Sequence, residues 1–240
     1  MLRKTFIIVG LFAIAMAFLE SAVVIYLREI YYPGGFGFPL KPVSGTVSVT
    51  EVFREAATMV MLVTVALLAE KDNLKRFAFF IYSFAIWDIF YYVFLYLLIS
   101  WPSSLLTWDL LFLLPCPWTG PVLAPVINSM TMILLAVLIV EGRKNGSSFS
   151  VNLPEWFLLV LGSILTIVSY LKDYLYFMIS HFHNFGFFSL RPSQDILEYS
   201  ARFSPVHFNW FPFIAGEILF FIAMFDMMWR IKRFSSTADD

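Results

Sequence analysis

Six long apolar stretches, separated by polar segments or by segments rich in Gly and Pro, dominate the pattern along this chain. A helix needs about 20 mostly apolar residues to cross roughly 30 Å of hydrocarbon. The stretches that reach or approach this length are 5–27, 47–69, 77–99, 121–140, 154–171 (with an extension toward 180) and 206–229. The pattern predicts one all-α domain over residues 1–234, an antiparallel bundle of six transmembrane helices, followed by a frayed polar tail over 235–240.

Composition agrees with a polytopic membrane protein. Of the 240 residues, 60% are apolar and 14% are charged, and the mean hydropathy is +0.80. The net charge of -1 provides no basic surface, which argues against recognition of DNA or RNA. The first stretch begins like a secretory signal, and Ala15 and Ala17 have the spacing of a cleavage site, but the apolar run continues to Leu27. We therefore expect an uncleaved first helix.

Lys and Arg are distributed unequally between the two sides of the predicted membrane. Cytoplasmic segments near helix ends carry the excess of these residues. One side receives Arg3, Lys4, Lys71, Lys75, Arg76, Arg143, Lys144, Arg230, Lys232 and Arg233, and the other receives Arg28, Lys41, Lys172, Arg191 and Arg202. This bias predicts cytoplasmic N and C termini, and the short cytoplasmic links favour a prokaryotic inner membrane.

The predicted outer connections are long and aromatic, which makes the outer face the expected working face. In the segment 101–120, Ser103 and Ser104 could cap a short helix that Pro115 and Pro117 would end. About ten apolar residues are too few to span, so this segment predicts an interfacial or re-entrant helix. The aromatic outer loops could also dock a membrane protein partner, although their Trp residues also suit the headgroup layer.

Five acidic residues interrupt the apolar stretches at or outward of the predicted midplane: Glu20, Glu51, Glu55, Asp88 and Glu217. An ionised side chain in hydrocarbon costs at least about 2.5 to 3.5 kcal/mol, so each acid needs a partner or a purpose. Glu51, Arg54, Glu55 and Thr58 recur at i, i+3, i+4 and i+7, which places them on one helical face. Arg54 could pair with an acid or bind an anionic substrate head. A wet N-terminal turn is the alternative reading of the outermost acid.

Asp88 is followed by Tyr91 and Tyr92 at i+3 and i+4, which can donate hydrogen bonds to a carboxylate or to a substrate. Trp210 is a further candidate substrate contact. The structural alternative is that buried acids tie helices together through donors such as Trp87 or Trp210. Asp226 lies opposite Glu217 on its helix and is expected to pair with Arg230 at i+4, in a structural role.

Metal chemistry is limited by the residue inventory. The hypothesis that remains is a carboxylate site for a hard cation or iron, built from Glu51, Glu55, Glu217 and the imidazole of His207. The sequence offers no facing histidines for a bis-His haem, no Cys/His spacing of a zinc-finger type and no H-E-x-x-H. The cofactor is therefore unknown.

Three hypotheses of function follow. The first is a membrane enzyme acting on a lipid-like substrate, with Glu20, Glu55, Asp88 and Glu217 as catalytic acids in a site that opens outward. The second is a proton- or ion-coupled transporter that uses the same acids as a relay. The third is a noncatalytic scaffold or subunit of a membrane complex, in which membrane lipids and a protein are the partners.

Overall fold

Six long helices make up most of the computed structural model, which describes residues 2–114, 116–144, 149–182 and 194–236. They are α1 (Leu2–Tyr31), α2 (Gly45–Ala69), α3 (Asn73–Ile99), α4 (Leu123–Gly142), α5 (Leu153–His181) and α7 (Trp210–Ser236). All six are long and apolar enough to cross a membrane, which confirms the predicted bundle. α5 is the fifth stretch with its extension, and α7 includes 235 and 236 of the predicted tail; 237–240 lie outside the described residues.

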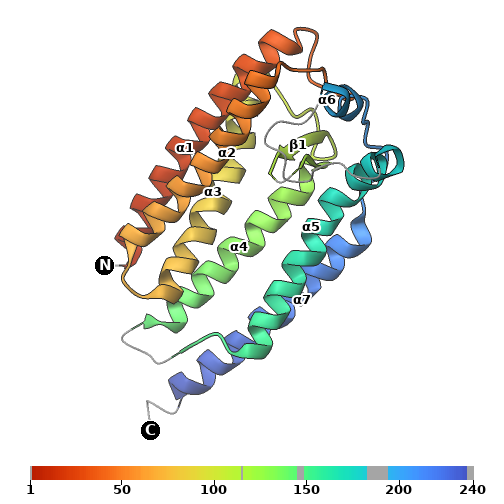
Figure 1. Ribbon diagram of the computed structural model, residues 1–240. Helices are drawn as coiled ribbons and strands as arrows, with labels where there is room; N and C mark the ends of the chain where they lie inside the picture. The colour runs from red at the N-terminus through yellow and green to blue at the C-terminus, as the bar shows by residue number, and fades with distance from the viewer. Residues whose placement is uncertain (1, 115, 145–148, 183–193, 237–240) are drawn as a thin grey trace.

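Figure 1 shows the helices as neighbours in an elongated bundle. α1 and α2 both pack on α3, α3 packs on α4, α4 on α7, and α7 on α5. We call the end with connections 32–44, 100–122 and 182–209 the hairpin end. The opposite end, which we call the terminal end, holds both termini and the connections 70–72 and 143–152.

Helix starts follow from local capping chemistry. The Ser44 and Asp72 side chains accept hydrogen bonds from the third backbone N–H of α2 and α3, at 3.3 and 3.0 Å. Asn152 and Glu155 form a reciprocal capping box at the start of α5. These caps satisfy backbone donors that the helix itself leaves unpaired.

Small residues allow the closest helix contact, between α5 and α7. A Cβ added to Gly216 would lie 2.6 Å from Thr166 Oγ1 and 2.7 Å from the carbonyl oxygen of Gly162. Ala13 and Ala17 are likewise fully buried, packed with Trp87 of α3. These small side chains let neighbouring helices approach closely.

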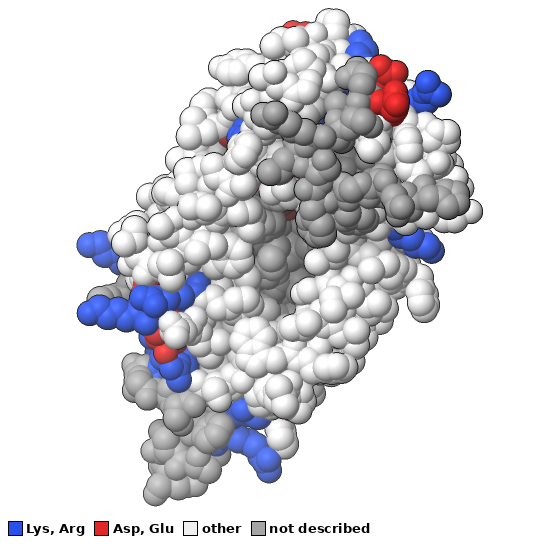
Figure 2. Space-filling model, in the orientation of Figure 1, with Lys and Arg blue, Asp and Glu red and all other residues white. Residues whose placement is uncertain are grey.

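The terminal half of the bundle has an apolar interior. One buried cluster there joins residues of all six long helices and the 143–152 connection, including Val9, Phe79, Ile139, Val151 and Met227. On the face shown in Figure 2, charged side chains gather toward the two ends and the surface between them is nearly uncharged. Large apolar side chains are exposed on the long helices, for example Leu11, Leu68 and Phe225. This is the surface a lipid-facing bundle needs.

The segment 101–120 is not a helix. It contributes β1 (Trp108–Phe112), and with β2 (Trp118–Pro121) it forms an antiparallel hairpin in which Leu110 lies opposite Thr119. A short apolar run flanked by aromatic residues suits a strand as well as a helix, and tertiary contacts decide between them. The short extra helix of this fold is instead α6 (Gln194–Ser200), in the third connection of the hairpin end.

Arg230 differs from its predicted role. Its contact with Asp226 is present but long, at 3.8 Å. Its main partner is the buried Glu155, which accepts hydrogen bonds from Nε at 3.0 Å and from Nη2 at 2.6 and 2.7 Å. The guanidinium thus links the end of α7 to the start of α5.

Candidate functional site: a carboxylate-lined cavity at the hairpin end

A cavity of about 730 Å³ lies at the hairpin end, with walls from α1, α2, α3, α6 and the β-hairpin. Most of its lining residues are apolar or aromatic. The charged ones are Glu20, Arg28, Lys41, Glu51, Arg54, Glu55, Asp88 and Asp109. An apolar cavity with a few convergent polar groups is the usual form of a small-molecule site.

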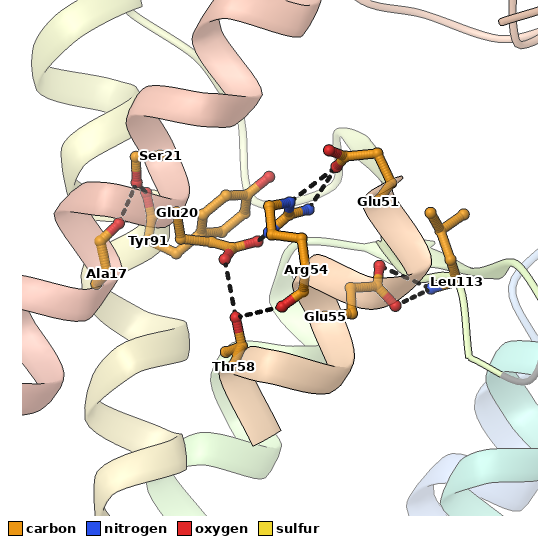
Figure 3. Close-up of polar contacts among 9 residues, drawn as sticks. All are labelled: Ala17, Glu20, Ser21, Glu51, Arg54, Glu55, Thr58, Tyr91 and Leu113. Atoms are coloured by element: carbon orange, nitrogen blue, oxygen red, sulfur yellow. Dashed lines mark hydrogen bonds and ion pairs between the residues drawn. The ribbon is translucent and has the colours of Figure 1, made fainter. Parts of the chain in front are cut away.

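Arg54 holds the first polar cluster together. Its guanidinium donates from Nε and Nη2 to Glu51 Oε2, at 2.9 and 2.7 Å, and from Nη1 to Glu20 Oε1. Thr58 Oγ1 lies 3.4 Å from the other oxygen of Glu20. Figure 3 shows Arg54 between the two acids, so that α1 and α2 are joined through one cation. The predicted shared face of Glu51, Arg54 and Thr58 is what makes this cluster possible.

Glu55 is separate from that cluster. Its two oxygens accept from the backbone N–H of Leu113 at 3.0 and 2.9 Å, and its residue is 7% exposed. In Figure 3 its carboxylate points away from Arg54 and toward the segment that follows β1. No Lys or Arg forms an ion pair with Glu55 within the described ranges. Glu55 is therefore a buried acid whose donor is neutral.

Arg28 and Asp109 form a second ion pair across the cavity wall, and the sequence did not single out either residue. Arg28 Nη2 donates to Asp109 Oδ1 at 3.1 Å, which anchors the hairpin to α1. The guanidinium also stacks on Trp101, 3.7 Å from the ring centroid, and on Phe36 at 4.3 Å. Burial raises the pKa of Asp109 to about 6, and the positive charge of Arg28 opposes that shift.

Not every polar atom around the cavity is satisfied. Arg28 Nη1, Trp87 Nε1 and Asp109 Oδ2 are buried without a hydrogen-bond partner in the described part of the chain, although the Tyr92 hydroxyl is close enough to lower the pKa of Asp109. All four residues line the cavity. Buried polar groups are normally paired, so unpaired ones concentrated around one cavity indicate a polar guest.

Asp88 also lines the cavity, beside Tyr91 and Tyr92. Ser129 of α4 donates a hydrogen bond to Asp88 Oδ2 at 2.8 Å. As with Glu55, the partner is neutral and no ion pair to Lys or Arg occurs among the residues described. The predicted neighbourhood of this acid and the two phenols is present, because i+3 and i+4 positions share a helical face.

Glu217 does not line this cavity. Thr131 of α4 donates to Glu217 Oε2 at 2.6 Å, and Oε1 is buried without a partner in the described residues. Trp210 packs against Phe208 and Phe213 and is likewise outside the lining. The four predicted deep acids therefore divide: Glu217 links α7 to α4, and the other three face the cavity.

The arrangement gives no support to the proposed metal ligands. His207 is exposed and does not line the cavity, and Glu217 is held by Thr131. Only Glu51 and Glu55 of that hypothesis line the cavity. Within the described ranges, no three His, Cys, Asp or Glu residues are grouped so that they could hold a metal ion.

A pattern along α1, unused in the prediction, could have identified Arg28. Glu20, Val24, Leu27, Arg28 and Tyr31 recur at intervals of one to four residues, and all of them line the cavity. They form one face of α1, which would have connected the acid to the basic residue two turns later. No comparable pattern identified Asp109, because its place depends on the hairpin. Comparison of the chain with protein-family models, with curated proteins and with solved structures found no match.

Proposed function

We propose that this protein is a membrane enzyme that acts on a lipid-like substrate held in the hairpin-end cavity. The observation that carries the proposal is the convergence of Glu20, Glu55 and Asp88 on one cavity of about 730 Å³ with mainly apolar walls. Such a cavity can accommodate an apolar chain beside groups able to transfer protons. The excess of Lys and Arg on the terminal connections supports an outward-facing cavity with both termini cytoplasmic. The short cytoplasmic links favour a prokaryotic inner membrane, and an endoplasmic reticulum protein is the alternative.

Glu55 is the proposed general acid or base. A proton-transfer group must gain and lose its proton during the reaction, and a tight ion pair would hold it ionised. Glu55 has a backbone N–H as its partner instead of a cation. Asp88, held by the Ser129 hydroxyl, is proposed as the second such group. Arg54 is a positioning residue, because its positive charge is already paired with Glu20 and Glu51.

The test is turnover of membrane lipids. Purified protein is incubated with a total lipid extract in uncharged detergent, and mass spectrometry identifies species that are consumed or formed. We expect Glu55→Gln to slow this conversion by about 100-fold or more, the effect of removing a general acid or base. Glu141→Gln, which changes an exposed acid at the terminal end, is the matched control. Conversion at the wild-type rate by Glu55→Gln, or no conversion by the wild type, would contradict the proposal.

A transport function has one specific observation in its favour. Asp88 with Ser129 and Glu217 with Thr131 place two acid–hydroxyl pairs along α4. Acids inside the membrane often mark proton pathways. Against a continuous path, the terminal half is closed by the apolar cluster around Phe79, Ile139 and Met227. The same hydrogen bonds also suit the scaffold hypothesis, in which these acids connect helices.

A further inference from the structure

The charges around the cavity do not balance. Five acids and three bases line it. Arg54 is shared by Glu20 and Glu51, and Arg28 is paired with Asp109. The remaining base, Lys41, is exposed, and its Nζ lies 5.5 Å from the centroid of the Tyr32 ring.

The acids left over are Glu55 and Asp88. Each accepts from a neutral donor, a backbone N–H or a hydroxyl, at 2.8 to 3.0 Å. A charged carboxylate in a low-dielectric site is stabilised most by a cation that also donates hydrogen bonds. In the described part of the chain, neither acid has such a cation.

A second observation, independent of this charge count, also indicates a guest that donates hydrogen bonds. Asp109 is 1% exposed and lines the cavity, and its Oδ2 is buried without a hydrogen-bond partner in the described part of the chain, although the Tyr92 hydroxyl lies close to this carboxylate. The cavity wall thus contains a deeply buried acceptor without a donor, in addition to two acids without a cation. A guest that supplies several N–H donors and a positive charge answers both deficits, and the unpaired donors Arg28 Nη1 and Trp87 Nε1 are left for an acceptor group of the same guest.

The rest of the lining fits the remainder of such a guest. Tyr31, Tyr32 and Tyr91 present aromatic rings to the cavity, and rings of this kind attract ammonium groups. Val24, Val52 and Leu110 provide apolar wall from α1, α2 and β1. An alkyl chain would gain about 0.8 kcal/mol for each CH₂ that it buries there when it enters from water.

We infer that the cavity selects an amphiphile with a primary ammonium head, held by Glu55 and Asp88, with its alkyl chain against the apolar wall. This inference rests on the proposed function, since it names the substrate class of the same cavity. A neutral head would leave both acids without a cation. An anionic head would meet an excess of negative charge.

The experiment compares three probes of equal chain length: tetradecylamine, tetradecanol and tetradecanoate. The full-length protein in uncharged detergent is mixed with all three, re-purified, and the retained probes are quantified by mass spectrometry. A Val52→Trp variant, which fills the cavity from α2, gives the background retention. We expect the amine to be retained about 10- to 100-fold more than the alcohol, the range for hydrogen bonds to a charged group.

Variants then assign the preference to the two acids. We expect Glu55→Gln and Asp88→Asn each to reduce the amine-to-alcohol ratio, and the double variant to bring it near one while the alcohol is still retained. The matched controls, Glu141→Gln and Asp226→Asn, change exposed acids and should leave the ratio unchanged. The comparison of probes on the wild-type protein holds even if a variant fails to fold.

Three outcomes would contradict the inference, and each has a different meaning. Retention of the alcohol or of tetradecanoate as strong as that of the amine overturns the ammonium preference and leaves a lipid-binding cavity in place. An amine preference that persists in the double variant overturns the role of the two acids. Retention of no probe above the Val52→Trp background overturns the preference together with the proposed function.

Discussion

The acidic residues at the two ends of the bundle differ in how completely they are paired with Lys or Arg side chains. At the terminal end, Asp72 is paired with Arg143 and Glu155 with Arg230. At the hairpin end, five acids line one cavity and share two guanidinium groups. An acid with its own cation contributes to architecture, since the pair joins two segments and leaves no free charge. A deficit of cations around a cavity leaves acids available for a guest.

The strongest test of this contrast is removal of a terminal-end acid. Glu155→Ala deletes the partner of Arg230 and half of the α5 capping box. We expect the free energy of unfolding to fall by about 4 kcal/mol, roughly 3 for the broken, partly buried ion pair and 1 for the cap. Thermal unfolding in detergent would show it, and Glu141→Ala, at an exposed pair, is the control. If Glu155→Ala lowered the unfolding temperature no more than Glu141→Ala does, Glu155 would not be a structural anchor.

The next test concerns Asp109, whose ion pair with Arg28 anchors the β-hairpin to α1. Because the pKa of Asp109 is raised from 3.8 to about 6, the folded protein binds this proton more tightly than the unfolded chain does. The stability contributed by Asp109 is therefore greatest below pH 3.8 and falls as the pH rises to about 6, by about 2 to 3 kcal/mol.

The test measures the free energy of unfolding of the wild type and of Asp109→Asn at several pH values in this window. The difference between them isolates the stability that Asp109 contributes. The variant should lose the part of the pH slope that belongs to Asp109, whereas Asp226→Asn, whose side chain is 48% exposed, should keep it. Equal slopes in wild type and Asp109→Asn would argue against a buried, titrating Asp109.

The smallest effect is expected at Asp72. The hydrogen bond from Arg143 lowers the pKa of Asp72, so its stabilising effect is present above its ordinary pKa of 3.8 and is lost as the pH falls through the lower folded value. Asp72→Asn keeps the cap of α3 but removes a pair whose side chains are 28% and 26% exposed. We expect a loss of about 0.5 kcal/mol at pH 7, measured by thermal unfolding. If Asp72→Asn lowered the free energy of unfolding as much as Glu155→Ala, solvent exposure would not explain the difference between the Asp72–Arg143 and Glu155–Arg230 pairs.

The six spans could be predicted from the sequence alone. So could the shared helical face of Glu51, Arg54, Glu55 and Thr58, and the proximity of Asp88 to Tyr91 and Tyr92. These features depend on helix period and on the length of apolar runs, which are local properties of the chain. Capping at Ser44 and Asp72 is local in the same way.

Which acids are paired with a Lys or Arg side chain depends on the tertiary structure. Arg28 and Asp109 are 81 residues apart and meet because 101–120 folds as part of a hairpin instead of a helix. Glu217 leaves the predicted site because α7 packs on α4, where Thr131 binds it. Pairing across such separations depends on how helices and strands pack, and hydrophobic period fixes which face of a helix is buried but not which residue it meets.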